Sequence, residues 1–268
     1  MRTFLQAIRY STTGVFVTGL ISVLQGCSLR EGALLGLVLL GVQLCGATPL
    51  DTLYWTDEGL MRIYRCSVGN GQSCEPELVA VEATFDEFGN DDIAVDLVHG
   101  FLYWGTSNSA KGALRRCSIW AAMPCTPETV LENSSGSTPN GVHIDAVNGY
   151  VYFVVGDGFV QRCGLGNSLP CVPQTVATFS PGFLRSVAVM DEDVYMARTG
   201  GIYRCSMAES LPCALTLWLS GGSPSSLDVD RTRGLLYWTE SVTDTVQRCE
   251  IGPTKACKPE IVANTGAG

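Results

Sequence analysis

The chain has 268 residues, 46% of them hydrophobic, which is enough for the core of one large all-β domain or of two ordinary domains. Residues 1–47 contain three arginines and one glutamate, so residues 48–268 carry a net charge of −11 within the total of −9. This acidic body argues against binding to a phosphate backbone, which needs clustered Lys and Arg. It indicates a solvated surface, with a cationic partner as the alternative.

Two apolar runs lie near the N-terminus, at residues 15–24 and 33–44. The second is preceded by Arg30 and followed by Cys45-Gly46-Ala47, and small residues at these positions are typical of a secretory cleavage site after Ala47. Neither run has the roughly 20 residues needed to span a bilayer. We therefore interpret residues 1–47 as an export signal with an extended start. An uncleaved membrane anchor and a bacterial lipoprotein site at Cys27 are the alternatives.

Residues 48–268 contain five Arg-Cys pairs, each followed by a second cysteine eight positions after the first. The cysteine pairs are Cys66/Cys74, Cys117/Cys125, Cys163/Cys171, Cys205/Cys213 and Cys249/Cys257. Upstream of each pair lies an aromatic-rich segment, whose tyrosines are 49, 49, 43 and 42 residues apart. A period in the forties predicts a repeat protein with one four-stranded propeller blade in each unit.

The regular cysteines predict disulfides formed in an oxidising compartment. The alternative, a set of zinc sites, would need short C-x2-C spacings, and His99 and His143 are too few to supply the missing ligands. Each disulfide would close a loop of about nine residues and contribute about 2.5 kcal/mol in the chain-entropy model.

Four strands can be assigned within a unit. A short alternating strand such as residues 93–96 comes first, the aromatic strand second, and the third runs into the first cysteine. The fourth is expected to begin at the second cysteine and to carry a proline, as in residues 125–130. The cysteine pair would then staple the outer hairpin of the blade, and the aromatics of strand two would fill the contacts between blades.

The number of units leaves two interpretations open. Nothing that resembles residues 93–96 precedes the first aromatic segment, so the first unit lacks its opening strand. The chain is either a five-bladed ring with a three-stranded first blade or a part of a longer, six-bladed ring. We favour terminal truncation, because an open ring leaves blade faces uncovered.

The segment Tyr54-Trp55-Thr56-Asp57 matches the Y-W-T-D signature of the low-density-lipoprotein-receptor class B propellers. Over about residues 50–264 the chain resembles this family, with the paired cysteines as a separate feature of a disulfide-stapled branch. The resemblance implies an all-β propeller fold. Further signature positions are Tyr103, Trp104, Tyr152, Tyr195, Tyr237 and Trp238. A receptor's ligand does not transfer with the fold.

No nucleophile elbow, P-loop, zinc-protease motif or dinucleotide fingerprint is present. His99 and His143 are interpreted as a turn residue and a strand residue. Asp96, Asp145 and Asp230 end the first strands of their units and are expected to stabilise turns, as in the YWTD repeat. The alternative is a propeller lactonase or lyase that holds a divalent cation in a central channel, since residues 139–142 resemble a gluconolactonase-group segment. We expect no catalysis, no cofactor and no metal.

We therefore predict a secreted or extracellular, receptor-like module of residues 48–268 that binds a protein or has a structural role. Its contact with a membrane would be limited to residues 1–47 if these stay uncleaved. Candidate binding residues are loop aromatics, which mark an interface where they cluster on one face: Phe85, Phe88, Trp120, Phe179 and Phe183. Asn133 opens an N-x-S sequon, a glycosylation acceptor in a eukaryotic secretory pathway.

Overall fold

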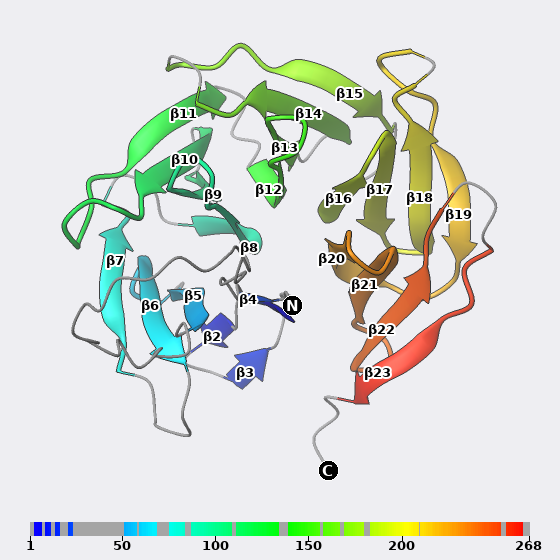
Figure 1. Cartoon of the computed structure of the whole chain (residues 1–268), viewed down its shortest axis with the longest axis horizontal. Helices are drawn as coiled ribbons and strands as arrows, with labels where there is room; N and C mark the ends of the chain where they lie inside the picture. The colour runs from blue at the N-terminus through cyan, green and yellow to red at the C-terminus, as the bar shows by residue number, and fades with distance from the viewer. Residues whose placement is uncertain are drawn as a thin grey trace, which may run out of the picture.

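A computed structural model describes residues 3–6, 9–11, 14–16, 21–23, 51–57, 59–68, 75–83, 87–108, 111–133, 139–155, 158–166, 169–179, 183–208, 210–252 and 256–264. Within these residues the structure is all-β, and five antiparallel sheets stand as blades around a common centre (Figure 1). None of the described segments is a helix long and apolar enough to cross a membrane.

Blade one is a three-stranded sheet, and blades two to five have four strands each in chain order. Blade one comprises β5 (Asp51–Asp57), β6 (Arg62–Val68) and β7 (Glu77–Val81). Blade two comprises β8 (Glu87–Asp96), β9 (Phe101–Ser107), β10 (Gly112–Ser118) and β11 (Glu128–Asn133). Blade three comprises β12 (Pro139–Asp145), β13 (Tyr150–Val155), β14 (Phe159–Gly164) and β15 (Gln174–Thr178).

Blade four comprises β16 (Ser186–Met190), β17 (Asp193–Arg198), β18 (Gly201–Ser206) and β19 (Thr216–Ser220). Blade five comprises β20 (Pro224–Asp230), β21 (Leu235–Glu240), β22 (Thr245–Glu250) and β23 (Glu260–Asn264). The first strands β8, β12, β16 and β20 face the centre (Figure 1), where β8 contacts β12, β12 contacts β16, and β16 contacts β20. Five blades, and a first blade whose described residues form no opening strand, are as predicted from the five sequence units.

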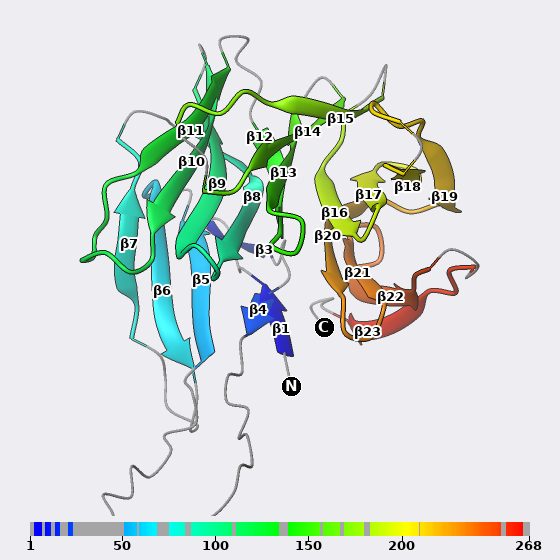
Figure 2. The same cartoon turned by 45° about the horizontal axis from the view of Figure 1, so that its top comes forward.

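Near the N-terminus the structure describes four short strands. These are β1 (Thr3–Gln6), β2 (Arg9–Ser11), β3 (Gly14–Phe16) and β4 (Ile21–Val23). β1 pairs with β4 and β2 with β3. β2 lies beside β5 (Figure 1), and so does β4 (Figure 2). The apolar run at residues 33–44 and the expected cleavage site after Ala47 lie outside the described residues, so the export signal remains a prediction.

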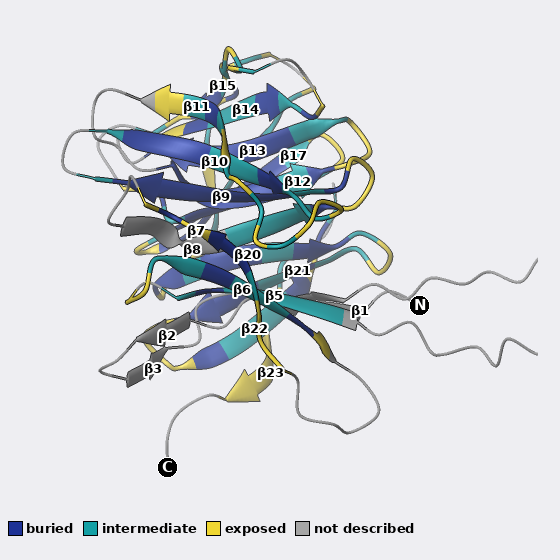
Figure 3. Cartoon of the chain, turned by 90° about the vertical axis from the view of Figure 1, so that its left-hand side faces the viewer, coloured by how far each residue is buried: buried dark blue, intermediate teal, exposed yellow. Residues whose placement is uncertain are grey.

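The core lies between blades rather than within them, because successive side chains of a strand point to opposite faces of its sheet. Trp104 packs toward blade one with Ile63, whereas its neighbour Tyr103 packs toward blade three with Phe153. Trp104 and Trp238 are fully buried in this way, as predicted for the aromatics of strand two. In Figure 3 the buried positions lie along the strands and the exposed ones mainly at the turns.

Two neighbouring blades approach each other closely at Gly105, on β9. A Cβ placed there would overlap the carbonyl oxygen of Pro139 on β12, so this position accepts no side chain. Glycine is required here by the close approach of two backbones.

The expected start of strand four is wrong. β7, β11 and β23 begin at Glu77, Glu128 and Glu260, each one residue after the proline and three after the second cysteine. Proline has no N–H to donate to a sheet, and the preceding cysteine segment is used for a contact with another blade, described below.

Candidate functional site

Four of the predicted cysteine pairs are joined as disulfides. Their Cα–Cα separations are 6.2 Å for Cys117–Cys125, 6.1 Å for Cys163–Cys171, 5.8 Å for Cys205–Cys213 and 5.4 Å for Cys249–Cys257. Cys66 is also disulfide-bonded, and its predicted partner Cys74 lies outside the described residues. In these four disulfides the first cysteine is on the third strand of its blade, and the second lies in the loop that leads to strand four.

The second cysteine also connects its loop to the preceding blade. The backbone N–H of Cys125 donates to the carbonyl of Val79 at 2.9 Å, across from blade two to blade one. Cys171 and Cys213 donate in the same way to the outermost strands of blades two and three, both at 2.8 Å. Each of these loops is therefore fixed twice, by a disulfide bond within its own blade and by a backbone hydrogen bond to the preceding blade.

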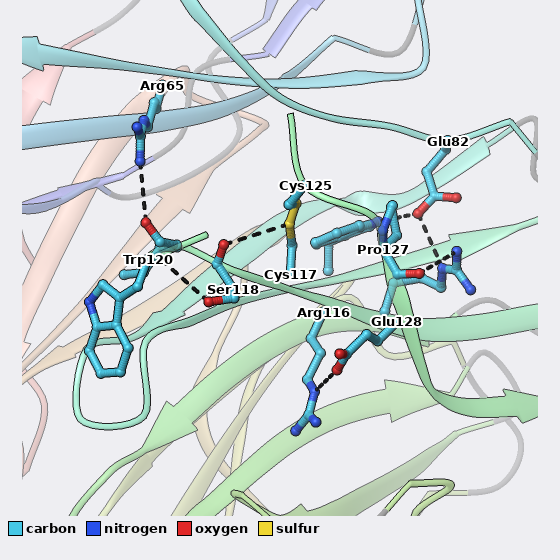
Figure 4. The surroundings of a disulfide bond; sticks show 12 residues. Arg65, Glu82, Arg116, Cys117, Ser118, Trp120, Cys125, Pro127 and Glu128 are labelled. Carbon is cyan, nitrogen blue, oxygen red and sulfur yellow. Dashed lines mark hydrogen bonds and ion pairs between the residues drawn. A yellow bond between two sulfur atoms is a disulfide. The ribbon is translucent and has the colours of Figure 1, made fainter. Parts of the chain in front are cut away.

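The arginine of each Arg-Cys pair belongs to a row of side chains that crosses its blade. The arginine is on the middle one of the three outer strands. It lies directly opposite the signature tyrosine on one neighbouring strand and opposite the residue twelve positions after itself on the other. The five rows are Tyr54–Arg65–Glu77, Tyr103–Arg116–Glu128, Tyr152–Arg162–Gln174, Tyr195–Arg204–Thr216 and Tyr237–Arg248–Glu260. Arg116 pairs with Glu128 at 2.9 Å beside the disulfide (Figure 4). The sequence showed the repeated arginine, but its partners depend on strand register.

The aspartates that end the first strands stabilise turns, as the structural interpretation predicts. One carboxylate oxygen of Asp96 accepts the backbone N–H groups of Val98 and His99, and the other lies 2.7 Å from His99 Nδ1. Asp145 and Asp230 bind the amides of their own turns in the same way. The turns end at glycines with φ values of +72°, +75° and +65°, at residues 100, 149 and 234.

No group of three or more His, Cys, Asp or Glu that could hold a metal ion occurs among the residues that the structure describes. The three aspartates proposed for a channel cation therefore form no such group. Arg231 Nη2 also donates to Oδ1 of Asp145, at 2.9 Å. His99 is exposed in its turn and His143 is on β12, as predicted for a turn residue and a strand residue.

The environment of His143 was not predicted. Its Nε2 lies 3.2 Å from the carbonyl of Val189 on β16, and its Nδ1 lies 3.9 Å from the carboxylate of Asp228 on β20. Arg231 shares the Val189 carbonyl at 3.1 Å. His143 and Asp228 occupy the same position of strand one in blades three and five, where blade four has Ala188. Aligning the repeat units shows that the two residues share one position of the repeat. That their side chains come close in space depends on how the blades are arranged around the ring.

Burial shifts the titration of both groups. The pKa of His143 is lowered to about 4, mainly by desolvation and then by the nearby charge of Arg231. The pKa of Asp228 is raised to about 7, mainly by desolvation, with a smaller contribution from the charge of Asp230. At neutral pH the imidazole is therefore uncharged and the carboxyl group is close to half protonated.

Exposed apolar side chains gather on one edge of the ring. The turns between strands one and two and the loops between strands three and four leave the same edge of each blade, which we call the disulfide rim. On blades two and three this rim carries five exposed apolar side chains: Leu97, Val98, Trp120, Val147 and Val172. The exposed fractions are 69% for Trp120 and 92% for Val172.

The loop of Trp120 is well fixed. Its ring covers Gly100, where an added Cβ would overlap ring atoms, and Ile119 N–H donates to the Gly100 carbonyl at 2.9 Å. Arg65 of blade one reaches the Ile119 carbonyl at 3.4 Å (Figure 4). The exposed indole is thus held beside the Cys117–Cys125 disulfide.

The other predicted binding aromatics do not join this rim. Phe183 is exposed between blades three and four, on the opposite rim. Phe179 packs edge-on against Tyr203 at 4.8 Å and under Arg198 at 4.4 Å. Phe85 lies outside the described residues, as do the side chains of Phe88 and Asn133.

Comparisons with known proteins bear on the fold. No family model and no curated protein matches the chain. The crystal structure of a nidogen/laminin complex is similar at a TM-score of 0.62 and 15% identity, over 78% of this chain and 74% of that chain. Two further similar structures are named as enzymes. The fold is a β-propeller.

The first of these is the PQQ-bound aldose sugar dehydrogenase from Streptomyces coelicolor, with a TM-score of 0.58 and 13% identity over 81% of this chain and 80% of that chain. The second is a putative gluconolactonase, with a TM-score of 0.52 and 17% identity over 71% and 68%. At these identities the likeness concerns the fold alone. It confirms the propeller implied by the YWTD signature and leaves the activity open.

Proposed function

We propose that this propeller is an extracellular, non-catalytic module that binds a protein partner through the disulfide rim of blades two and three. The observation that carries the proposal is Trp120, an indole that is 69% exposed yet fixed against Gly100 beside a disulfide. Tryptophan is enriched among the residues that dominate binding energy at interfaces. A side chain that is already ordered loses little conformational entropy when it is buried by a partner.

The neighbours of Trp120 extend the same surface. Val98 stands in the turn that Trp120 covers, and His99 of that turn lies beside Gly166 of the blade-three loop. Exposed apolar side chains that lie together on a surface mark interaction sites in soluble proteins, and these share one rim. The repeated disulfides support an extracellular setting, since such bonds persist in oxidising compartments and are rare in the cytosol.

The metal-dependent lactonase or lyase is not favoured by a comparable observation. It would need carboxylates that converge on a cation, and Asp96, Asp145 and Asp230 each bind the amides of their own turn.

Site-specific photo-crosslinking tests the proposal. A photoreactive residue is placed at position 120 or, as the control, at Leu60, an exposed apolar residue on the opposite rim. Each protein is incubated with intact cells and conditioned medium of the source organism. We expect a discrete crosslinked protein from position 120 that is lost when Val98→Asp is added, and no such product from position 60. Equal products from both positions, or none from position 120, would refute binding through this rim.

A further inference from the structure

The charged residues of the disulfide rim are distributed unevenly among the blades. In blades four and five, each turn between strands one and two and each loop between strands three and four contains a charged residue. The turns hold Asp191 and Glu192 or Arg231 and Arg233, and the loops hold Glu209 or Lys255 and Lys258. In blades two and three the corresponding residues 97–100, 118–126, 146–149 and 164–173, which we call the uncharged patch, include no Asp, Glu, Lys or Arg. Because the same places hold charges elsewhere in the ring, the propeller fold does not require this composition.

The charged side chains next to the uncharged patch are engaged within the protein. Asp96 and Asp145 precede its two turns, and their side chains are fully buried and bind the amides of those turns. His99 lies 2.7 Å from Asp96 through its Nδ1. Arg116 is 12% exposed and lies over the ring of Phe101, 4.2 Å from its centroid. The patch therefore offers a partner mainly apolar and neutral polar groups.

We propose that the partner of the disulfide rim receives Trp120 in an uncharged, apolar concavity, so that binding depends little on ionic strength. This inference rests on the proposed function and specifies the chemistry of the protein that binds there. Trp120 and Val172 are exposed and project from their loops, so a surface that covers them is concave around them. A partner's charge placed against the patch would lose its water without gaining a counter-charge, which is costly. Salt screens charges, and the centre of this interface has none to screen.

A protein fits the uncharged patch better than a lipid surface does. The ring of Trp120 covers Gly100, where an added Cβ would overlap its atoms, so the indole is held in one position. A pocket of matching shape binds such an ordered side chain with little loss of entropy, whereas a fluid bilayer has no fixed shape to match. The patch also contains no Lys or Arg to contact lipid phosphates, and the acidic body of the chain is repelled by anionic lipids.

The probe for the purified full chain, with its disulfides intact, is β-cyclodextrin, an uncharged ring of glucose units with an apolar cavity. The indole N–H resonance of Trp120 is identified as the one that Trp120→Ala removes. We expect β-cyclodextrin to shift this resonance, with a dissociation constant that changes less than about threefold between about 50 and 500 mM NaCl. Phe183→Ala, which removes an exposed ring of the opposite rim, is the matched control and should leave the titration unchanged.

Charged hosts of the same shape supply the comparison. Amino-substituted and carboxymethylated β-cyclodextrins should bind at Trp120 no more tightly than the neutral host, because the patch has no charge to pair with theirs. A neutral host that leaves the Trp120 resonance unshifted overturns the inference, as does a charged host that binds there more than about threefold tighter. Phosphatidylcholine vesicles that perturb this resonance would assign the patch to a lipid surface and also overturn it.

Photo-crosslinking from position 120 separates this inference from the proposed function. The yield of the crosslinked protein should change less than about threefold between about 50 and 500 mM NaCl. A product whose yield falls further with salt refutes the uncharged partner and leaves protein binding through the rim intact. The absence of any product from position 120 refutes both.

Discussion

The pair formed by His143 and Asp228 at the centre of the ring gives the sharpest prediction, and the perturbation is Asp228→Asn. In the folded chain the pKa of Asp228 is raised from 3.8 to about 7 by burial, although 21% of its side chain remains exposed. Between pH 4 and pH 7 this carboxyl group therefore binds more protons in the folded state than in the unfolded state. Its contribution to the free energy of unfolding falls as the pH rises through this window.

A shift of one pKa unit corresponds to 1.36 kcal/mol, so the ionised carboxylate costs the folded wild type roughly 4 kcal/mol above pH 7. Asparagine does not titrate. The stability of Asp228→Asn relative to wild type should therefore increase by roughly this amount between pH 4 and pH 7.5. His143 contributes with the opposite sign: its pKa is lowered from 6.5 to about 4, so its contribution stabilises the fold as the pH rises from 4 to 6.5.

Urea denaturation of both proteins at half-unit pH steps measures the difference. Glu192→Gln, which removes an exposed carboxylate of a turn, is the matched control and should differ from wild type by the same small amount at every pH. A difference between Asp228→Asn and wild type that stays constant from pH 4 to pH 8 would refute the reasoning.

Three further predictions concern stability. Replacing both Cys163 and Cys171 by alanine should lower the free energy of unfolding by about 2.5 kcal/mol in urea denaturation, and a loss below 1 kcal/mol would contradict the loop-entropy argument. Glu82→Ala leaves the buried indole N–H of Trp104 without its acceptor, so we expect a loss of about 1–3 kcal/mol, whereas an unchanged denaturation midpoint would count against this contact. Gly105→Ala forces a Cβ into the backbone of the next blade and should reduce the thermal midpoint by several degrees. A variant that unfolds at the wild-type midpoint would contradict this close approach.

The sequence predicts the repeat because each unit repeats the same local chemistry. The spacing of Tyr54 and Cys66 recurs approximately in every unit, and antiparallel strands joined by short turns follow from it. The turn role of Asp96 was also predictable, since its oxygens bind amides two and three residues later. These features depend on interactions between residues that are close in the sequence, so they can be predicted from it.

The contacts between blades could not be predicted in the same way. That Cys125 donates to Val79, and that His143 meets Asp228, depends on the angle at which one sheet packs on the next. The expectation that strand four starts at the second cysteine was wrong for this reason. In the sequence Cys125 resembles the first residue of strand four in its own blade. Its backbone N–H is instead hydrogen-bonded to the outermost strand of the preceding blade.

Peptide mapping of the unreduced protein, isolated from its source, tests the central claim most directly. Each repeat unit should yield one linked peptide pair that joins cysteines eight positions apart, five pairs in all, with no free thiol among them. Cysteines linked between different units, or Cys163 and Cys171 recovered as free thiols, would contradict both the disulfide-stapled blade and the proposed extracellular setting.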